Sequence, residues 1–145
     1  MIYTPLTIRA MQIAFAAHNG QTDKSGVPYI FHPIHLAEQM ENELTCCVAL
    51  LHDTVEDTDV TLEMLSMEFP EEVVEAVGLL THDPETDYYD YVRKIRSNAT
   101  AVRVKIADLQ HNMDTARFAG VEIPKEKIGY FRDKYTKAKA ILLED

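Results

Sequence analysis

The chain has 145 residues, with 14 basic and 24 acidic side chains that give a formal net charge of −10. A hydrophobic fraction of 46% and a charged fraction of 26% exclude a disordered or fibrous protein. The acidic balance argues against nucleic acid or an anionic membrane as a partner, because both bind basic surfaces. We expect a single domain over residues 1–145, long enough to bury a core without disulfides.

Three features of the sequence bear on its compartment. The longest apolar run, Cys46–Leu51, is far shorter than the roughly 20 residues that a membrane-spanning helix needs. No basic segment followed by a long apolar core stands at the amino terminus, so we expect no secretory signal. The two cysteines are neighbours, which seldom bridge each other, and this favours a reducing environment. These features predict a cytoplasmic protein.

Helical signals follow one another along the whole chain. Thr4 and Pro5 are typical of an N-cap and a first helical position, and Gly20 suits the helix end. The inward face of this first helix is expected to carry Ile8, Met11, Ile13 and Phe15. A loop is predicted over 19–29, and further helices over 33–40, 43–55, 61–68, 70–80, 88–96, 99–118 and 124–142. Because no segment alternates like a strand, the sequence predicts an all-α fold of about seven or eight helices.

The segment 99–118 has two faces. One stripe is apolar and consists of Val102, Ile106, Leu109 and Met113. A second stripe is polar, has the same spacing, and consists of Lys105, Asp108 and Asn112. Asp108 lies among apolar neighbours in sequence, so its carboxylate needs a partner.

The densest chemical signal runs from His52 to Asp57, directly after the apolar run. On a continuous helix His52 and Glu56 would stack one turn apart, as would Asp53 and Asp57. Ionisable groups at the edge of a core need compensation, for which a bound cation is the commonest device. The alternative is a helix end that emerges into solvent.

Two residues distant in sequence, His32 and Asp108, favour a bound cation over a helix end in solvent. His32 follows three apolar residues and precedes a proline. Alone it is more often a core histidine than a ligand. Taken together, His32, His52, Asp53 and Asp108 form a set of two histidines and two carboxylates that suits Mn²⁺, Fe²⁺ or Zn²⁺ and leaves positions open.

At this point the sequence resembles a known family. His52-Asp53 with His32 and Asp108 resembles the HD superfamily of metal-dependent phosphohydrolases, which implies a helical HD-domain fold. Longer segments are similar to the RelA/SpoT-type hydrolase domain for guanosine polyphosphates, in particular its small stand-alone members. These segments are Ala17–Gln21, Lys24–Pro33, Leu50–Thr58 and Val104–Asn112.

The resemblance implies a role for each matching residue. One Mn²⁺ would be held by His32, His52, Asp53 and Asp108. Glu56 and Asp57 would handle the attacking water and the proton transfers. Lys24 would contact a phosphate, and Asn112 would contact the nucleotide. Ser25 and Tyr29 would help to shape the entrance to the site, so we call the predicted loop over 19–29 the entrance loop. The implied reaction removes the 3′-pyrophosphate from ppGpp or pppGpp to give GDP or GTP.

One position departs from the family pattern. Asp23 stands where the family usually has a basic residue that helps to hold the purine, and an aspartate cannot stack on a base and would repel phosphate. The segment Asp87–Tyr91 could offer another platform for the base, or its tyrosines could simply pack on the core. This leaves two alternatives open, which are an HD phosphohydrolase for another nucleotide and a nucleotide sensor without turnover. The intact Glu56 and Asp57 favour an enzyme.

The remaining histidines are not expected to bind the metal. His18 would hydrogen-bond the entrance loop, His35 would be partly exposed, His82 would lie in a loop, and His111 would support Asp108. The sequence leaves open whether the chain forms a homo-oligomer.

Overall fold

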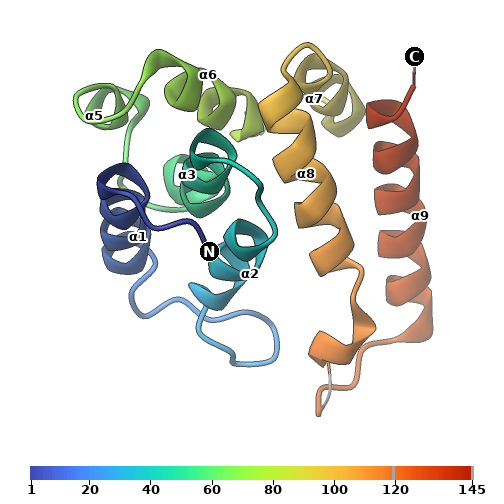
Figure 1. Ribbon diagram of the computed structural model, residues 1–145. Helices are drawn as coiled ribbons and strands as arrows, with labels where there is room; N and C mark the ends of the chain where they lie inside the picture. The colour runs from blue at the N-terminus through green and yellow to red at the C-terminus, as the bar shows by residue number, and fades with distance from the viewer. Residues whose placement is uncertain (119, 145) are drawn as a thin grey trace.

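A computed structural model describes residues 1–118 and 120–144, and this part of the chain is built from helices (Figure 1). The predicted all-α class is confirmed, and the single β-bridge in the described residues joins Thr22 to Pro28. The elements are α1 (Pro5–Ala17), α2 (Phe31–Glu38), α3 (Glu43–Leu51), α4 (Thr54–Asp57), α5 (Leu62–Ser66), α6 (Glu71–Leu80), α7 (Tyr88–Ile95), α8 (Ala99–Asn112), the 3₁₀ helix η1 (Thr115–Phe118) and α9 (Lys125–Leu142).

Helix α3 forms the centre of the fold. Its residues Cys46–Leu51 are all fully buried, and both cysteine thiols are free. A helix without a polar face must be surrounded, and α3 is covered by α1, α2, α6 and α8. Its start is fixed by Asn42, whose side chain accepts a hydrogen bond from the Thr45 amide at 2.9 Å. The carboxyl end of α3 therefore lies inside the protein.

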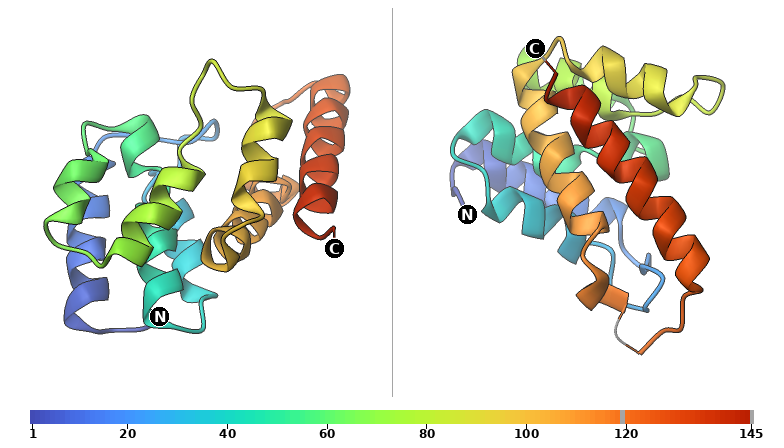
Figure 2. Two further views of the ribbon diagram at one scale, coloured as in Figure 1. Left: turned by 90° about the horizontal axis from the view of Figure 1, so that it is seen from above. Right: turned by 90° about the vertical axis from the view of Figure 1, so that its right-hand side faces the viewer.

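Helices α7, α8 and α9 pack together at one side of the molecule (Figure 2). Helix α9 runs antiparallel to α8, on the side of α8 that faces away from α2 and α3 (Figure 1). Helix α8 therefore separates the first part of the fold from α9. In the residues that the structure describes, no helix is both long enough and apolar enough to span a bilayer.

The predicted helix over 43–55 is interrupted. Helix α3 ends at Leu51, and α4 begins only at Thr54. Side chains compete here for the carbonyl oxygens of the last turn, because the Thr54 hydroxyl donates to the Leu51 carbonyl at 2.7 Å and His52 Nδ1 lies 2.6 Å from the Ala49 carbonyl. The chain turns after His52 and does not continue straight into solvent.

Two further helix boundaries differ from the predicted ones. Helix α2 begins at Phe31 and contains Pro33 in its first turn, where a missing amide proton costs no hydrogen bond. Helix α8 ends at Asn112, and a 3₁₀ turn over Thr115–Phe118 replaces its predicted continuation.

The predicted inward face of α1 is confirmed only in part, because Met11 and Ile13 pack against the core and the other two residues do not. Ile8 and Phe15 are 43% and 65% exposed, whereas Thr7, Ala10 and Ala14 are fully buried. These small side chains allow α1 to approach α3 closely. The Thr7 hydroxyl is satisfied within the chain, because it donates to the Ile2 carbonyl at 2.7 Å.

Candidate active site

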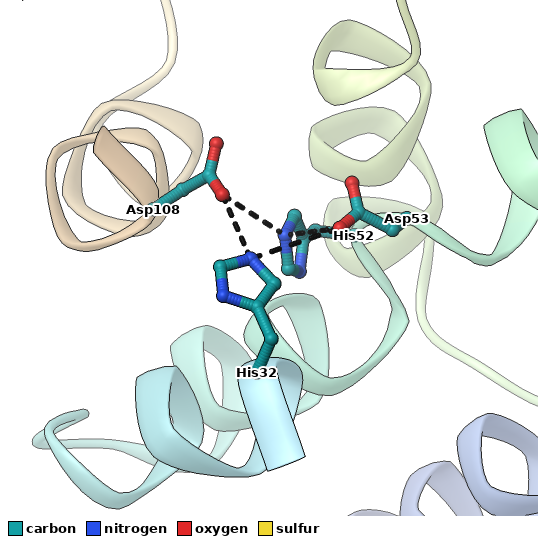
Figure 3. Close-up of side chains that lie close together, drawn as sticks. All are labelled: His32, His52, Asp53 and Asp108. Atoms are coloured by element: carbon teal, nitrogen blue, oxygen red, sulfur yellow. Dashed lines mark hydrogen bonds and ion pairs between the residues drawn. The ribbon is translucent and has the colours of Figure 1, made fainter. Parts of the chain in front are cut away.

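Four side chains from three segments converge where α8 meets α2 and the end of α3 (Figure 3). His32 is in the first turn of α2, His52 and Asp53 follow α3, and Asp108 is in α8. His32 Nε2 lies 2.9 Å from Asp108 Oδ1 and 3.8 Å from Asp53 Oδ2. His52 Nε2 lies 3.0 Å from Asp53 Oδ2 and 3.6 Å from Asp108 Oδ1.

This arrangement matches the demands of a divalent metal ion. Two ligand atoms at about 2.1 Å from one ion and at right angles to each other lie roughly 3 Å apart, close to the shorter separations in this set. His52 Nε2 is buried, and although it lies near both carboxylates it makes no well-directed hydrogen bond in the described residues, which suits a nitrogen that faces a ligand. Two nitrogen and two oxygen donors from His32, His52, Asp53 and Asp108 could therefore hold a divalent metal.

Each histidine is oriented by a hydrogen bond from its other ring nitrogen. His52 Nδ1 donates to the Ala49 carbonyl at 2.6 Å, which leaves the lone pair on Nε2. His32 Nδ1 lies 2.7 Å from His111 Nδ1, and the two rings are nearly coplanar at 7°. Burial and the charge of Arg117 lower the pKa of His111 to about 4, so His111 is neutral and can accept this proton. Both Nε2 atoms thereby point at the two carboxylates, where a metal could replace their present contacts.

Asp108 has the most hydrogen-bonding neighbours in the site. Its Oδ2 accepts from Lys105 Nζ at 3.0 Å, and its Oδ1 accepts from Asn112 Nδ2 at 3.1 Å. Lys105 is only 9% exposed and Asp108 only 6%. The polar stripe of α8 thus faces the interior at these two residues, while Val102 and Ile106 of the apolar stripe are half-buried.

The charges of the site are strongly coupled. Burial would raise the pKa of Asp108, but the Lys105 ammonium and the two histidines hold it well below its usual value. Burial would lower the pKa of His52, but the charge of Asp53 and hydrogen bonding to both carboxylates raise it well above its usual value. Without a metal, a proton on His52 helps to compensate the two carboxylates. A bound cation can replace that proton.

Glu56 and Asp57 lie beside this set. The sequence predicted that they would stack on His52 and Asp53 in one continuous helix, but the helix is interrupted between the two pairs. Glu56 and Asp57 lie in α4, and each offers one oxygen within 4.8 Å of the other and of an oxygen of Asp53. Glu56 Oε1 accepts from the backbone amide of His82 at 2.6 Å. Burial, together with the charge of Asp53, raises the pKa of both Glu56 and Asp57. This favours proton transfer near neutral pH.

Two adjoining cavities lead to the site. The one that we call the metal pocket has a volume of about 200 Å³ and is lined by Tyr29, His52, Asp53, Glu56, Asp57, Leu80, His82, Tyr88, Tyr91, Lys105, Asp108, Asn112, Lys134 and Tyr135. The other, which we call the apolar pocket, has a volume of about 280 Å³ and is lined by Thr22, Asp23, Lys24, Ser25, Tyr29, Asn112, Met113, Thr115, Arg117, Phe118, Ile123, Ile128, Phe131, Arg132 and Tyr135. Tyr29, Asn112 and Tyr135 line both, so the two cavities meet at these side chains.

The residues predicted to contact substrate lie in these cavities. Tyr29 donates to Asp53 Oδ2, and Ser25 Oγ donates to the Arg117 carbonyl at 2.7 Å. Lys24 Nζ lies 4.5 Å from the centre of the Phe131 ring. The entrance loop is thus attached both to the metal set and to the segment after α8.

Asp23 has a structural role that the sequence does not reveal. Its Oδ1 accepts from the amides of Ser25 at 2.8 Å and Val27 at 3.0 Å, which closes the entrance loop. Its Oδ2 lies 3.6 Å from Arg117 Nη2. Arg117 therefore compensates the charge of Asp23 and brings a cation to the apolar pocket.

The other histidines lie mostly where the sequence predicts. His18 Nδ1 lies 2.8 Å from Gln21 Oε1 in the entrance loop, His35 is exposed, and His82 lies in a loop. His111 differs, because it contacts His32 and does not support Asp108. The sequence analysis placed Lys105 on the same helix face as Asp108 but gave it no role, although a lysine three residues before an aspartate is a usable signal for an ion pair.

Removing Asp108 should destabilise the metal-free protein more than removing the Lys105–Asp108 pair. Asp108→Leu leaves the buried Lys105 ammonium without its carboxylate, at a cost of about 3–5 kcal/mol in the free energy of unfolding. The double variant Lys105→Met, Asp108→Leu should recover most of that loss. Urea denaturation in the presence of a chelator measures the free energy of unfolding of both variants. Equal losses in the two variants would show that Lys105 does not depend on Asp108.

His111 should matter for metal affinity although it is not a ligand. His111→Ala removes the acceptor that orients His32, and we expect metal affinity to fall about 10- to 100-fold. His35→Ala is the matched control. The His35 ring stacks on the His111 ring, with 4.1 Å between the ring centres, but makes no hydrogen bond to His32 in the described residues. Metal titration followed by calorimetry compares them. Equal affinity in His111→Ala and the parent would contradict the role.

Comparison with known proteins identifies relatives of this chain. A probable GTP pyrophosphokinase of Mycobacterium leprae is 40% identical over 82% of this chain and 16% of its own length. The bifunctional (p)ppGpp synthase/hydrolase SpoT of Escherichia coli is 36% identical over 74% of this chain and 17% of its own length. A guanosine-3′,5′-bis(diphosphate) 3′-pyrophosphohydrolase of Aquifex aeolicus is 35% identical over 75% and 17%. The chain thus spans about a sixth of the length of these relatives.

The fold is also that of a solved structure. A metazoan orthologue of SpoT, described as hydrolysing ppGpp and playing a role in starvation responses, matches with a TM-score of 0.81 at 24% identity, over 99% of this chain and 88% of that one. The family model described as HD domain matches residues 10–126. This chain therefore belongs to the HD domain family.

Proposed function

We propose that this protein is a Mn²⁺-dependent phosphohydrolase that removes the 3′-pyrophosphate from guanosine 3′,5′-polyphosphates. Water adds to the 3′-linked phosphorus, the bond from that phosphorus to the ribose oxygen breaks, and a proton passes to that oxygen. The products are GDP or GTP and pyrophosphate. Relatives that carry this activity in their names support the substrate class.

The observation that carries the proposal is the junction of the two cavities. Three of the four candidate metal-binding side chains (His52, Asp53 and Asp108) and the carboxylates of Glu56 and Asp57 line one cavity, and an apolar surface with cationic side chains lines the other. A nucleoside fits an apolar wall flanked by Arg117 and Arg132, and a phosphate ester fits a site that holds a divalent cation. Tyr29 and Asn112 at the junction would then face the ribose.

The side chains divide the chemical work as follows. When bound, Mn²⁺ supplies Lewis-acid activation of water and of the phosphoryl group, and the mixed nitrogen and oxygen donors suit this ion. Glu56, fixed by the His82 amide, accepts the proton of the attacking water. Asp57, whose pKa is raised by burial, donates a proton to the leaving ribose oxygen. Lys24 neutralises phosphate from the entrance loop.

A hydrolysis screen with product identification tests the proposal. The purified chain with Mn²⁺ is offered guanosine tetraphosphate, nucleoside monophosphates and phosphorylated dinucleotides. Release of GDP and pyrophosphate from guanosine tetraphosphate is the expected result. Turnover of a different nucleotide alone would refute the substrate. Binding without any turnover would identify a sensor.

Glu56→Gln should abolish most turnover without loss of metal. The glutamine can still accept the His82 amide proton, so the local structure is kept, but it cannot take a proton from water. We expect kcat to fall at least about 100-fold. Glu75→Gln, an exposed position on α6, is the control. Metal content by elemental analysis must remain at the parental level, and near-parental turnover would assign the proton transfer to another group.

Asp23 favours a second candidate substrate, which is another nucleotide whose base or sugar donates a hydrogen bond to this carboxylate. Asp23→Asn distinguishes the two, because the amide oxygen can still accept from Ser25 and Val27 while the negative charge is lost. For guanosine tetraphosphate, Arg117 is then free to attract phosphate, and an effect of about 1 kcal/mol lowers KM roughly fivefold with little change in kcat. Steady-state kinetics measures this. An unchanged or higher KM favours the second substrate.

A further inference from the structure

Two lysines line the metal pocket. Lys105 comes from α8 and Lys134 from α9, and both ammonium groups face the ring of Tyr88. Lys134 Nζ lies 4.3 Å from the centre of that ring, and Lys105 Nζ lies 5.8 Å from it. Nothing in the proposed mechanism uses Lys134.

The two lysines differ in how their charge is compensated. Lys105 is bound to Asp108 at 3.0 Å and is nearly buried. Lys134 is half-buried and takes part in none of the ion pairs found in residues 1–118 and 120–144. The Tyr88 ring attracts and orients its ammonium group without neutralising it. Lys134 therefore keeps a full positive charge available to a ligand.

The surroundings of Lys134 favour an anion with several oxygens. It lines the same cavity of about 200 Å³ as the metal-ligating atoms. The Tyr88 hydroxyl is buried and has no hydrogen-bond partner in the described chain, so this wall also contains an unused polar group. Because Asp108 already compensates Lys105, Lys134 is the one of these two ammonium groups whose charge an anion can still compensate.

We propose that Lys134, held over Tyr88, binds the terminal phosphate of the leaving pyrophosphate and makes the site selective for a diphosphate over a monophosphate at the 3′ position. This inference rests on the proposed function, because it places the reacting phosphate at the metal ligands. The terminal phosphate then extends away from the nucleoside toward α7 and α9. A 3′-monophosphate has no group that reaches Lys134.

Anion binding tests the subsite without turnover. Protein loaded with one equivalent of Mn²⁺ and dialysed is titrated with inorganic pyrophosphate and, separately, with orthophosphate. In Lys134→Met we expect the Kd for pyrophosphate to rise about tenfold, while the Kd for orthophosphate changes less than twofold. Lys134→Arg should bind pyrophosphate within about threefold of the parent, because the positive charge is retained.

Lys137→Met is the matched control. Lys137 is on the same helix, its Nζ lies 4.6 Å from the centre of the neighbouring Tyr89 ring, and it is exposed and outside both pockets. Its loss should leave both affinities at the parental value. The subsite is refuted if Lys134→Met binds pyrophosphate as the parent does, or if it weakens both anions equally.

Kinetics separates this inference from the proposed function. In the parent, kcat/KM should be higher for a guanosine 3′-diphosphate than for the matching 3′-monophosphate, and Lys134→Met should reduce that preference about tenfold. If the parent hydrolyses no guanosine polyphosphate but binds pyrophosphate through Lys134, the subsite stands and the substrate is wrong. If the parent hydrolyses the polyphosphate and Lys134→Met keeps the full preference, the subsite alone is refuted.

Discussion

The Asp108 carboxylate connects the core of this protein to its chemistry. It is 6% exposed and is contacted by Lys105 and Asn112 on its own helix and by His32 from α2. A carboxylate at this depth is tolerated only when charges and hydrogen bonds compensate it. The packing of α8 against α2 and α3 therefore depends on the same contacts that orient the metal ligands. Stability and metal binding are linked at this residue.

The interruption after α3 is the second constraint. A helix that is buried all round would deliver its last residues into solvent if it continued straight. Because Thr54 and His52 take the carbonyl oxygens of its final turn, the chain turns inside the protein and leaves His52 and Asp53 pointing at α8. The same turn brings α4, with Glu56 and Asp57, to the edge of the metal pocket. One local competition for hydrogen bonds thus places both His52–Asp53 and the Glu56–Asp57 pair.

The limits of prediction from the sequence follow from these features. Helix order and the four candidate metal-binding residues could be predicted, because periodicity, caps and residue type are local signals. Boundaries such as Leu51 and Asn112 depend on side-chain hydrogen bonds that form only after the helices pack. The exposure of Phe15 reverses what periodicity predicts, and periodicity alone does not reveal that Lys105 is buried, since the depth of a stripe is set by the neighbouring helix. The Arg117 partner of Asp23 is 94 residues away in sequence, beyond any local pattern.

The distribution of cations explains how a chain of net charge −10 can offer a site to a polyanion. A metal would neutralise the carboxylates of the metal pocket. The two cavities are also lined by three cationic side chains from separate segments, which are Lys24, Arg117 and Lys134. Lys24 and Lys134 are each held over an aromatic ring, which fixes an ammonium group without cancelling its charge. The field inside the cleft is therefore set by these few oriented groups and by the metal rather than by the net charge of the chain. Helix α9 supplies Lys134 to the metal pocket and Phe131 to the apolar pocket, so this last helix shapes both cavities.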